Sequence, residues 1–155
     1  MNLFLIGTSH KFQKGLNNAP VGCYAEFENL IRETASFNSV KVIAEEMSVA
    51  ALGSCKSLCK EVAGEIGVAH IFCDPDNSER EALGLPKIDD AETWGAREEH
   101  WLSRLQGADF PILFVCGANH VASFTDKCIA RGIFVTVLEQ DWAPDSLIPL
   151  EYRLL

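Results

Sequence analysis

The chain has 155 residues, 48% of them hydrophobic and 23% charged, which excludes a disordered protein and predicts one folded domain over residues 1–155. The formal net charge of −9 excludes general binding to the phosphate backbone of nucleic acids, which needs a basic surface. No apolar stretch is long enough to cross a membrane, and the opening apolar run lacks the basic flank of a signal peptide. We therefore expect a cytoplasmic protein that binds neither nucleic acid nor membrane.

The six cysteines are expected to be free thiols in a reducing compartment. Several of them lie inside apolar runs, where cysteine behaves as a small core residue. Cys55 and Cys59 are four residues apart and are expected on one helical face. A metal pair is one interpretation of this spacing. Core packing is favoured, because no second Cys/His pair has zinc-finger spacing.

Apolar runs of strand length alternate with segments of helical periodicity along the whole chain. The predicted strands are residues 2–8, 40–46, 68–73, 112–116 and 133–138. Helices are predicted over residues 22–36, in one long segment from Ser48 to Gly64, in a short segment through Glu81, and over residues 91–105 and 118–131. Residues 9–20 predict a loop, and the tail from Asp141 is expected to pack along the surface. This order predicts a three-layer α/β sandwich, with a mainly parallel sheet of about five strands and helices on both faces.

Two of the predicted strands end in the same motif, Gly-x-x-His. The two copies are Gly7-Thr8-Ser9-His10 and Gly117-Ala118-Asn119-His120. In a parallel α/β sheet the carboxyl ends of all strands lie at one edge, where ligands bind. We therefore expect His10 and His120 to be neighbours in space. Gly7 and Gly117 would let the backbone approach a ligand, and the turn from Gly117 to Asn119 would present N–H groups to an anion.

Carboxylates follow the other predicted strands. Glu45 and Glu46 end the second strand, and Asp74 follows the third. With the two imidazoles they form a set that suits a divalent metal or metal-free acid–base chemistry. Each also has a simpler interpretation. The pair Glu45-Glu46 can favour the start of a helix, and Asp74 before Pro75 is a common turn residue.

Other polar and aromatic residues are expected to have structural roles. His70 alternates within a strand and is expected to be a hydrogen-bonded core residue. His100 and Arg80 are expected at the surface. Trp94 and Trp101 are seven residues apart, which favours a packing stripe over a cofactor site.

Taken in order, these motifs resemble those of the superfamily that joins TraB/PrgY-type proteins, Tiki proteases, erythromycin esterases and haem-binding ChaN proteins. The matching features are the Gly-x-x-His motif at His10, a strand ending at Glu46 with Met47 after it, Arg97 with Trp101 four residues on, the second motif at His120, and the helix end at Gly132 before the last strand. This chain resembles a short member without the helical insertions of longer ones. The resemblance favours Glu46 over Glu45 as the site carboxylate.

The resemblance implies a small hydrolase with His10, Glu46, His120 and Arg97 at its site, acting on a small-molecule or peptide substrate. In one version His10, Glu46 and His120 hold Mn²⁺, Co²⁺ or Zn²⁺, which activates water. In the other a histidine activates water directly. Thr8, Glu45, Asp74 and Asn119 would contact the ligand, together with Gly7 and Gly117. The alternative is a non-catalytic module that binds an anion, a nucleotide or haem. The apolar residues 147–150 and 154–155 suggest a homodimer.

Overall fold

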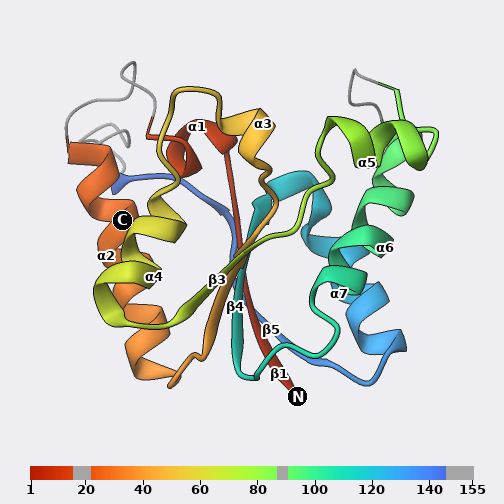
Figure 1. Ribbon diagram of the computed structural model, residues 1–155. Coiled ribbons are helices and arrows are strands. Elements are labelled where there is room, and N and C mark those ends of the chain that lie inside the picture. The colour runs from red at the N-terminus through yellow and green to blue at the C-terminus, as the bar shows by residue number, and fades with distance from the viewer. Residues whose placement is uncertain (16–21, 87–90, 146–155) are drawn as a thin grey trace.

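Five parallel strands form one sheet at the centre of the protein (Figure 1). The computed structural model describes residues 1–15, 22–86 and 91–145. The strands are β1 (Asn2–Thr8), β2 (Val42–Glu45), β3 (Ala69–Phe72), β4 (Ile112–Gly117) and β5 (Phe134–Trp142). Their order across the sheet is β3-β2-β4-β1-β5. The predicted parallel sheet is thereby confirmed.

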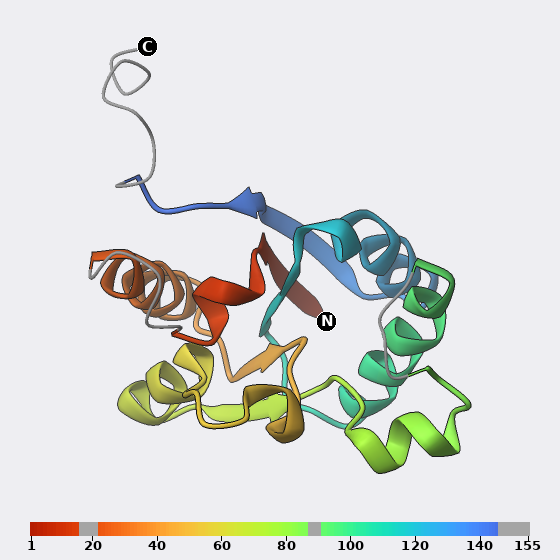
Figure 2. The ribbon, with the colours of Figure 1, turned by 90° about the horizontal axis from the view of Figure 1, so that it is seen from above.

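Helices cover both faces of this sheet, which confirms the predicted three-layer arrangement (Figures 1 and 2). The helices are α1 (His10–Gln13), α2 (Gly22–Phe37), α3 (Val49–Leu52), α4 (Leu58–Ile66), α5 (Asn77–Ala82), α6 (Trp94–Arg104) and α7 (Val121–Ala130). Two short 3₁₀ helices, η1 (Ala91–Thr93) and η2 (Ala118–His120), precede α6 and α7. One face carries α2 and α4, and the other carries α6 and α7 (Figure 1).

Side-chain alternation along the strands divides the core into two apolar clusters, one on each face of the sheet. In β4, Phe114 belongs to the cluster that also contains Trp101 of α6, whereas Val115 belongs to the cluster that contains Phe27 of α2. All four of these side chains are fully buried. Because both faces are covered, the central strands are apolar on both sides, and this is why they appear in the sequence as continuous apolar runs.

The central strands β1 and β4 form the switch point of the sheet. They pair along their full length, from Leu3 beside Ile112 to Thr8 beside Gly117. The chain leaves β1 toward α2 on one face and leaves β4 toward α7 on the other. Since the two connections diverge, a crevice opens between the carboxyl ends of these strands. Ligands bind at such a crevice in open α/β sheets.

Three predicted elements differ from the structure. The long helix expected from Ser48 is split into α3 and α4, because Gly53 takes a positive φ of 58° and Ser57 caps a second helix. Cys55 therefore lies between the two helices and shares no helical face with Cys59. The predicted loop over residues 9–20 contains the helical turn α1. The last strand continues to Trp142, because its end pairs with Thr8 of β1.

Two expectations fall on segments outside the described residues, and a third concerns membrane crossing. The helix cap expected at Asp89 or Asp90, and the tail segments expected to form a dimer, lie outside the described residues. Among the helices of the described ranges, none has both the length and the apolar character that a membrane crossing needs.

All six cysteines are free thiols, as expected, and five of them are buried. Burial raises the pKa of Cys59, Cys73 and Cys116 well above its ordinary value, and raises that of Cys128 to about 12. A raised pKa keeps a thiol protonated, and only the thiolate reacts with disulfide reagents.

We therefore expect one fast-reacting thiol in the native protein, that of the half-buried Cys55, and six after unfolding. Titration with a chromogenic disulfide at pH 8, with and without denaturant, counts them. Cys55→Ser should remove the fast phase. Any fast-reacting thiol in the Cys55→Ser protein would contradict the burial of the other five.

Candidate functional site

His10 and His120 meet at one carboxylate in the switch-point crevice. His10 is the first residue of α1, directly after β1, and His120 ends the 3₁₀ turn that follows β4. Nε2 of His10 lies 3.6 Å from Oε1 of Glu46, and Nε2 of His120 lies 3.4 Å from the same oxygen. The residues expected to be neighbours from the parallel-sheet rule are thus brought together, although 110 positions separate them in the chain.

Glu46 is fixed by strong donors on both of its oxygens. The backbone N–H of Gly117 donates to Oε2 at 2.7 Å, and the guanidinium of Arg97 donates to Oε1 at 2.6 Å. The side chain of Glu46 is 1% exposed. We had expected the Gly117 N–H to meet an anionic ligand, and the anion it holds is instead the protein's own Glu46.

Arg97 also binds Asp74, so it neutralises two buried carboxylates. Its Nε donates to Oδ1 of Asp74 at 2.9 Å, and Nε1 of Trp101 donates to the same oxygen at 3.0 Å. Arg80 donates to Oδ2 of Asp74 at 3.0 Å. Arg80 was expected at the surface, but its side chain is only 15% exposed, because Asp74 holds it against the protein. Asp74 thus holds Arg97 in place beside Glu46.

His120 is held more tightly than His10. Its Nδ1 lies 2.8 Å from Oε1 of Glu98, and the Ser123 hydroxyl donates to the same carboxylate oxygen. Its ring packs against Trp94 and Trp101, with centroid distances of 4.8 and 4.9 Å. The side chain of His120 is 5% exposed, whereas that of His10 is 47% exposed. The exposed imidazole is therefore the one that a ligand can reach directly.

A pocket of about 520 Å³ opens over this cluster. Its wall includes His10, Glu46, Arg97 and His120, and the predicted contacts Thr8, Gly117 and Asn119 also line it. The Thr8 hydroxyl donates to the carbonyl of Trp142 at 2.9 Å, which ties the ends of β1 and β5 together at the pocket rim. Trp94 and Asp141 complete the wall at its outer side.

The two motif glycines are required for different reasons. A Cβ on Gly117 would lie 3.3 Å from both Nε2 of His10 and Oε2 of Glu46, so a larger residue would crowd the site itself. A Cβ on Gly7 would instead lie 2.2 Å from the carbonyl oxygen of Gln140 and 2.5 Å from Cγ2 of Val121. Gly7 does not line the pocket. Its role is to let β5 and α7 pack against the end of β1.

Glu45 faces the opposite side of the sheet from Glu46, as neighbouring strand residues do. It is fully buried, and Nε2 of His70 lies 2.8 Å from its Oε1. The Ser57 hydroxyl also donates to Oε1, and Nε2 of Gln13 donates to Oε2 at 3.5 Å. His70 is hydrogen-bonded, as expected, but it lies half-buried on the edge strand β3 rather than in the core. Glu45 itself does not line either of the two pockets at this edge.

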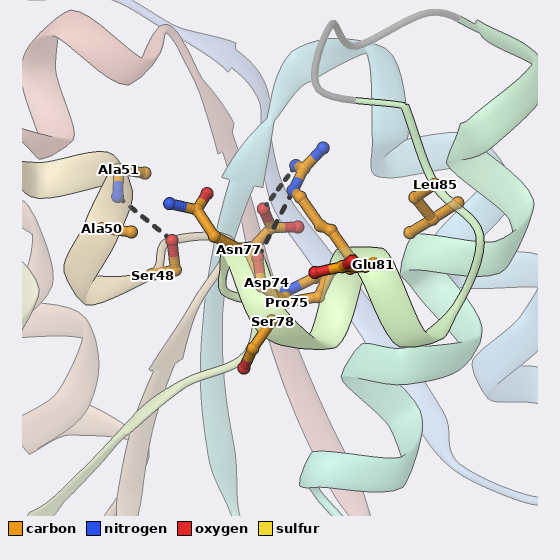
Figure 3. Close-up of a pocket in the computed structure, with 10 residues that line it drawn as sticks. Ser48, Ala50, Ala51, Asp74, Pro75, Asn77, Ser78, Glu81 and Leu85 are labelled. Carbon is orange, nitrogen blue, oxygen red and sulfur yellow. Dashed lines mark hydrogen bonds and ion pairs between the residues drawn. The ribbon is translucent and has the colours of Figure 1, made fainter.

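A second pocket, of about 860 Å³, lies beside the first at the ends of β2 and β3 (Figure 3). Ser48, Ala50 and Ala51 form one wall, and Asn77, Ser78 and Glu81 of α5 form the facing wall (Figure 3). Asp74 lies between the walls. Asp74 lines this second pocket and Arg97 lines the first, so the ion pair between them connects the two pockets.

The metal-ligand set His10, Glu46 and His120 stays a prediction. Within residues 1–15, 22–86 and 91–145, no three His, Cys, Asp or Glu side chains form a group that could hold a metal ion. The donor chemistry also disfavours one. Both oxygens of Glu46 already accept hydrogen bonds, and the Arg97 guanidinium places a positive charge where a cation would bind. A divalent ion would have to displace Arg97 from Glu46.

Sequence reasoning missed two polar residues that hold the histidines, Gln13 and Glu98. Gln13 lies three residues after His10, which brings the two side chains together once the segment is helical. That spacing was hidden because residues 9–20 were expected to form a loop. Glu98 follows Arg97 directly in α6, and only the packing of α6 against α7 shows that it reaches His120. His100 is also half-buried rather than solvated, with a side chain 14% exposed near Glu79.

We compared the chain with protein-family models, with curated proteins and with solved structures, and none of them matches it. The resemblance to the TraB/PrgY, Tiki, erythromycin esterase and ChaN superfamily therefore stays a prediction, based on the motif residues alone.

Proposed function

We propose that the protein is a small hydrolase that cleaves an ester or amide bond with water activated by His10. The observation that carries this proposal is the position of His10 Nε2, which lies 3.6 Å from Glu46 Oε1 in the wall of a pocket at the sheet switch point. That distance is too long for a direct hydrogen bond. A water molecule in contact with both atoms would bridge them, in position for proton transfer to the imidazole.

The reaction balances with the residues of this pocket. Nε2 of His10 accepts a proton from water while the water oxygen attacks the carbonyl carbon of the substrate. The negative charge that develops on the carbonyl oxygen is stabilised by the positive charge of Arg97, which lines the pocket. When the tetrahedral intermediate collapses, the bond to the leaving oxygen or nitrogen breaks, and His10 returns its proton to that atom. Glu46 stabilises the imidazolium of His10 between these steps.

The arrangement favours the metal-free version of this chemistry over the metal version. Metal-assisted hydrolysis would need Glu46 to bind the ion, yet Glu46 accepts from Arg97 at 2.6 Å and from the Gly117 N–H at 2.7 Å. Both oxygens of Glu46 thus accept from strong donors, and an ion would have to displace one of them. We therefore expect activity to persist after treatment with a chelator.

The second pocket gives the proposed enzyme room for the part of the substrate that does not react. It lies beside the first at the carboxyl edge, and its walls carry the polar side chains of Ser48, Asn77 and Ser78 (Figure 3). Such walls suit a polar small molecule or a short peptide segment. Binding energy from this part would orient the reacting carbonyl over His10.

The proposal is tested with His10→Ala and a panel of small chromogenic esters and anilides. Acid–base catalysis contributes about 10²- to 10⁴-fold, so kcat/KM should fall by at least about 100-fold while the protein remains folded. His100→Ala is the matched control, because His100 lies on α6 outside the pocket. A folded His10→Ala protein with full activity would exclude both versions of the proposal.

The alternative of a ligand-binding module is tested in the same set of proteins. An anion or a nucleotide can be held by the same pocket without turnover. Haem would need an accessible imidazole nitrogen as its axial ligand, which the 47% exposed His10 offers and the 5% exposed His120 does not. Ligand binding without hydrolysis, lost in His10→Ala, would favour the module.

A further inference from the structure

The ring of His10 lies between two carboxylates that come from consecutive residues. Its Nε2 faces Glu46 on one side of the sheet. Its Nδ1 lies 2.7 Å from Oε1 of Gln13, and Nε2 of Gln13 donates to Oε2 of Glu45 on the other side. Gln13 is 0% exposed, and so is Glu45. A buried amide thus connects the exposed imidazole of the pocket to a buried carboxylate that the proposed reaction does not use.

The chemistry of these groups fixes the direction of every hydrogen bond. A carboxylate only accepts, so the amide group that faces Glu45 must be the NH₂ of Gln13. The reversed amide would place its oxygen against the carboxylate and is excluded by repulsion. The oxygen of Gln13 therefore faces His10, and it can only accept a hydrogen bond. Nδ1 of His10 must then carry the proton.

Glu45 is a firm anchor for this chain of bonds. Besides Gln13, its carboxylate accepts from the Ser57 hydroxyl and lies 2.8 Å from Nε2 of His70. The carboxylate also contributes, after burial, to the raised pKa of Cys59, whose thiol contacts it. A buried carboxylate with so many donors has one favoured orientation. Its Oε2 is the oxygen that faces the amide of Gln13.

We propose that Gln13 and Glu45 are positioning residues that hold neutral His10 as the Nδ1–H tautomer. In that tautomer Nε2 carries the lone pair and faces Glu46 and the pocket, as a base that receives a proton from water must. The proposal rests on the proposed function for its purpose, but the tautomer is a property of the free protein and is measured without any substrate.

The two histidines then differ in their partners. Nδ1 of His10 faces a neutral amide oxygen, whereas Nδ1 of His120 faces the carboxylate of Glu98. An amide oxygen fixes the tautomer of a neutral imidazole without adding negative charge. A carboxylate in the same place also accepts from Nδ1 but adds a negative charge beside the ring. This difference, together with the exposure of the His10 ring, assigns proton transfer to His10.

The test is histidine ring ¹⁵N NMR on the full-length protein, at a pH where His10 is neutral, with His10→Asn to assign its signals. We expect protonated Nδ1 and bare Nε2 for His10 in the wild type. Gln13→Leu should replace this state by a mixture of tautomers, and kcat/KM on any substrate found should fall by about 100-fold. Gln106→Leu, at an exposed glutamine outside the pocket, should change neither the tautomer of His10 nor kcat/KM.

A double exchange separates positioning from a loss of packing. Gln13→Glu, combined with Glu45→Gln to avoid two adjacent buried carboxylates, keeps an acceptor of similar shape facing Nδ1 of His10 and should retain the Nδ1–H state that Gln13→Leu loses. A wild-type protein with Nε2–H at His10 would overturn the proposal even if Gln13→Leu failed to fold. A correct tautomer in a protein without hydrolytic activity would count against the proposed function and leave the positioning role intact.

Discussion

Replacing Arg97 by methionine should lower the free energy of unfolding by about 3–5 kcal/mol, the usual cost of removing one partner from a buried ion pair. Arg97 is 3% exposed and neutralises both Glu46 and Asp74 through contacts of 2.6 and 2.7 Å. Methionine fills a similar volume, so most of the effect comes from the two carboxylates that lose their shared cation. Urea unfolding followed by far-UV circular dichroism measures it.

Two further variants show whether charge or geometry matters at this position. Arg97→Lys keeps the charge, but a single ammonium does not reproduce the planar fork that reaches both carboxylates, so we expect an intermediate loss. Arg104→Met removes the partner of Glu79, and the side chain of Arg104 is 44% exposed. Exposed pairs contribute about 1 kcal/mol or less, so this control should change little. An Arg97→Met protein as stable as the Arg104→Met protein would show that the buried pairs are not essential to the fold.

The sequence predicts the layers and the edge of the sheet where the site lies, because both depend on local patterns. Continuous apolar runs indicated strands covered on both faces, and the parallel-sheet rule then placed the residues after Gly7 and Gly117 at one edge. The same alternation along β2 explains why Glu45 and Glu46 face opposite sides. The pairing order of the strands is not contained in these patterns, since any order of five apolar runs satisfies them.

What the sequence did not reveal depends on contacts between distant elements. Asp74, expected to meet a ligand, lines the second pocket, and it also holds Arg97, Arg80 and Trp101, because α5 and α6 fold over the end of β3. No local pattern records that a carboxylate will meet two arginines from other helices. The network behind His10 is of the same kind, because Gln13 and Glu45 come from separate elements. The carboxylate that meets the two histidines was therefore easier to predict than the groups that hold the histidines from behind.

Replacing Gly7 by alanine should lower the free energy of unfolding by about 3 kcal/mol or more, because the added Cβ would overlap the backbone of a neighbouring strand. The new atom would lie 2.2 Å from the carbonyl oxygen of Gln140 and 2.5 Å from Cγ2 of Val121. A side chain can rotate away, but a strand carbonyl moves only with its strand, so β5 would have to shift along the end of β1. Thermal and urea unfolding of Gly7→Ala measure the cost.

The matched control for this change is Gly64→Ala, in the exposed interior of α4, where an added Cβ meets nothing within 4 Å. Alanine has a higher helix propensity than glycine, so the free energy of unfolding of this variant should rise by about 0.5–1 kcal/mol. Gly7→Ala should therefore be less stable than the wild type and Gly64→Ala more stable. This contrast separates the effect of close packing at Gly7 from any general effect of replacing glycine by alanine. Because Gly7 lies outside the pocket, a Gly7→Ala protein that folds should keep the tautomer of His10. Equal stability of Gly7→Ala and wild type would mean that β5 does not pack against β1 as closely as described, and that the first glycine of the motif is required by the ligand rather than by the fold.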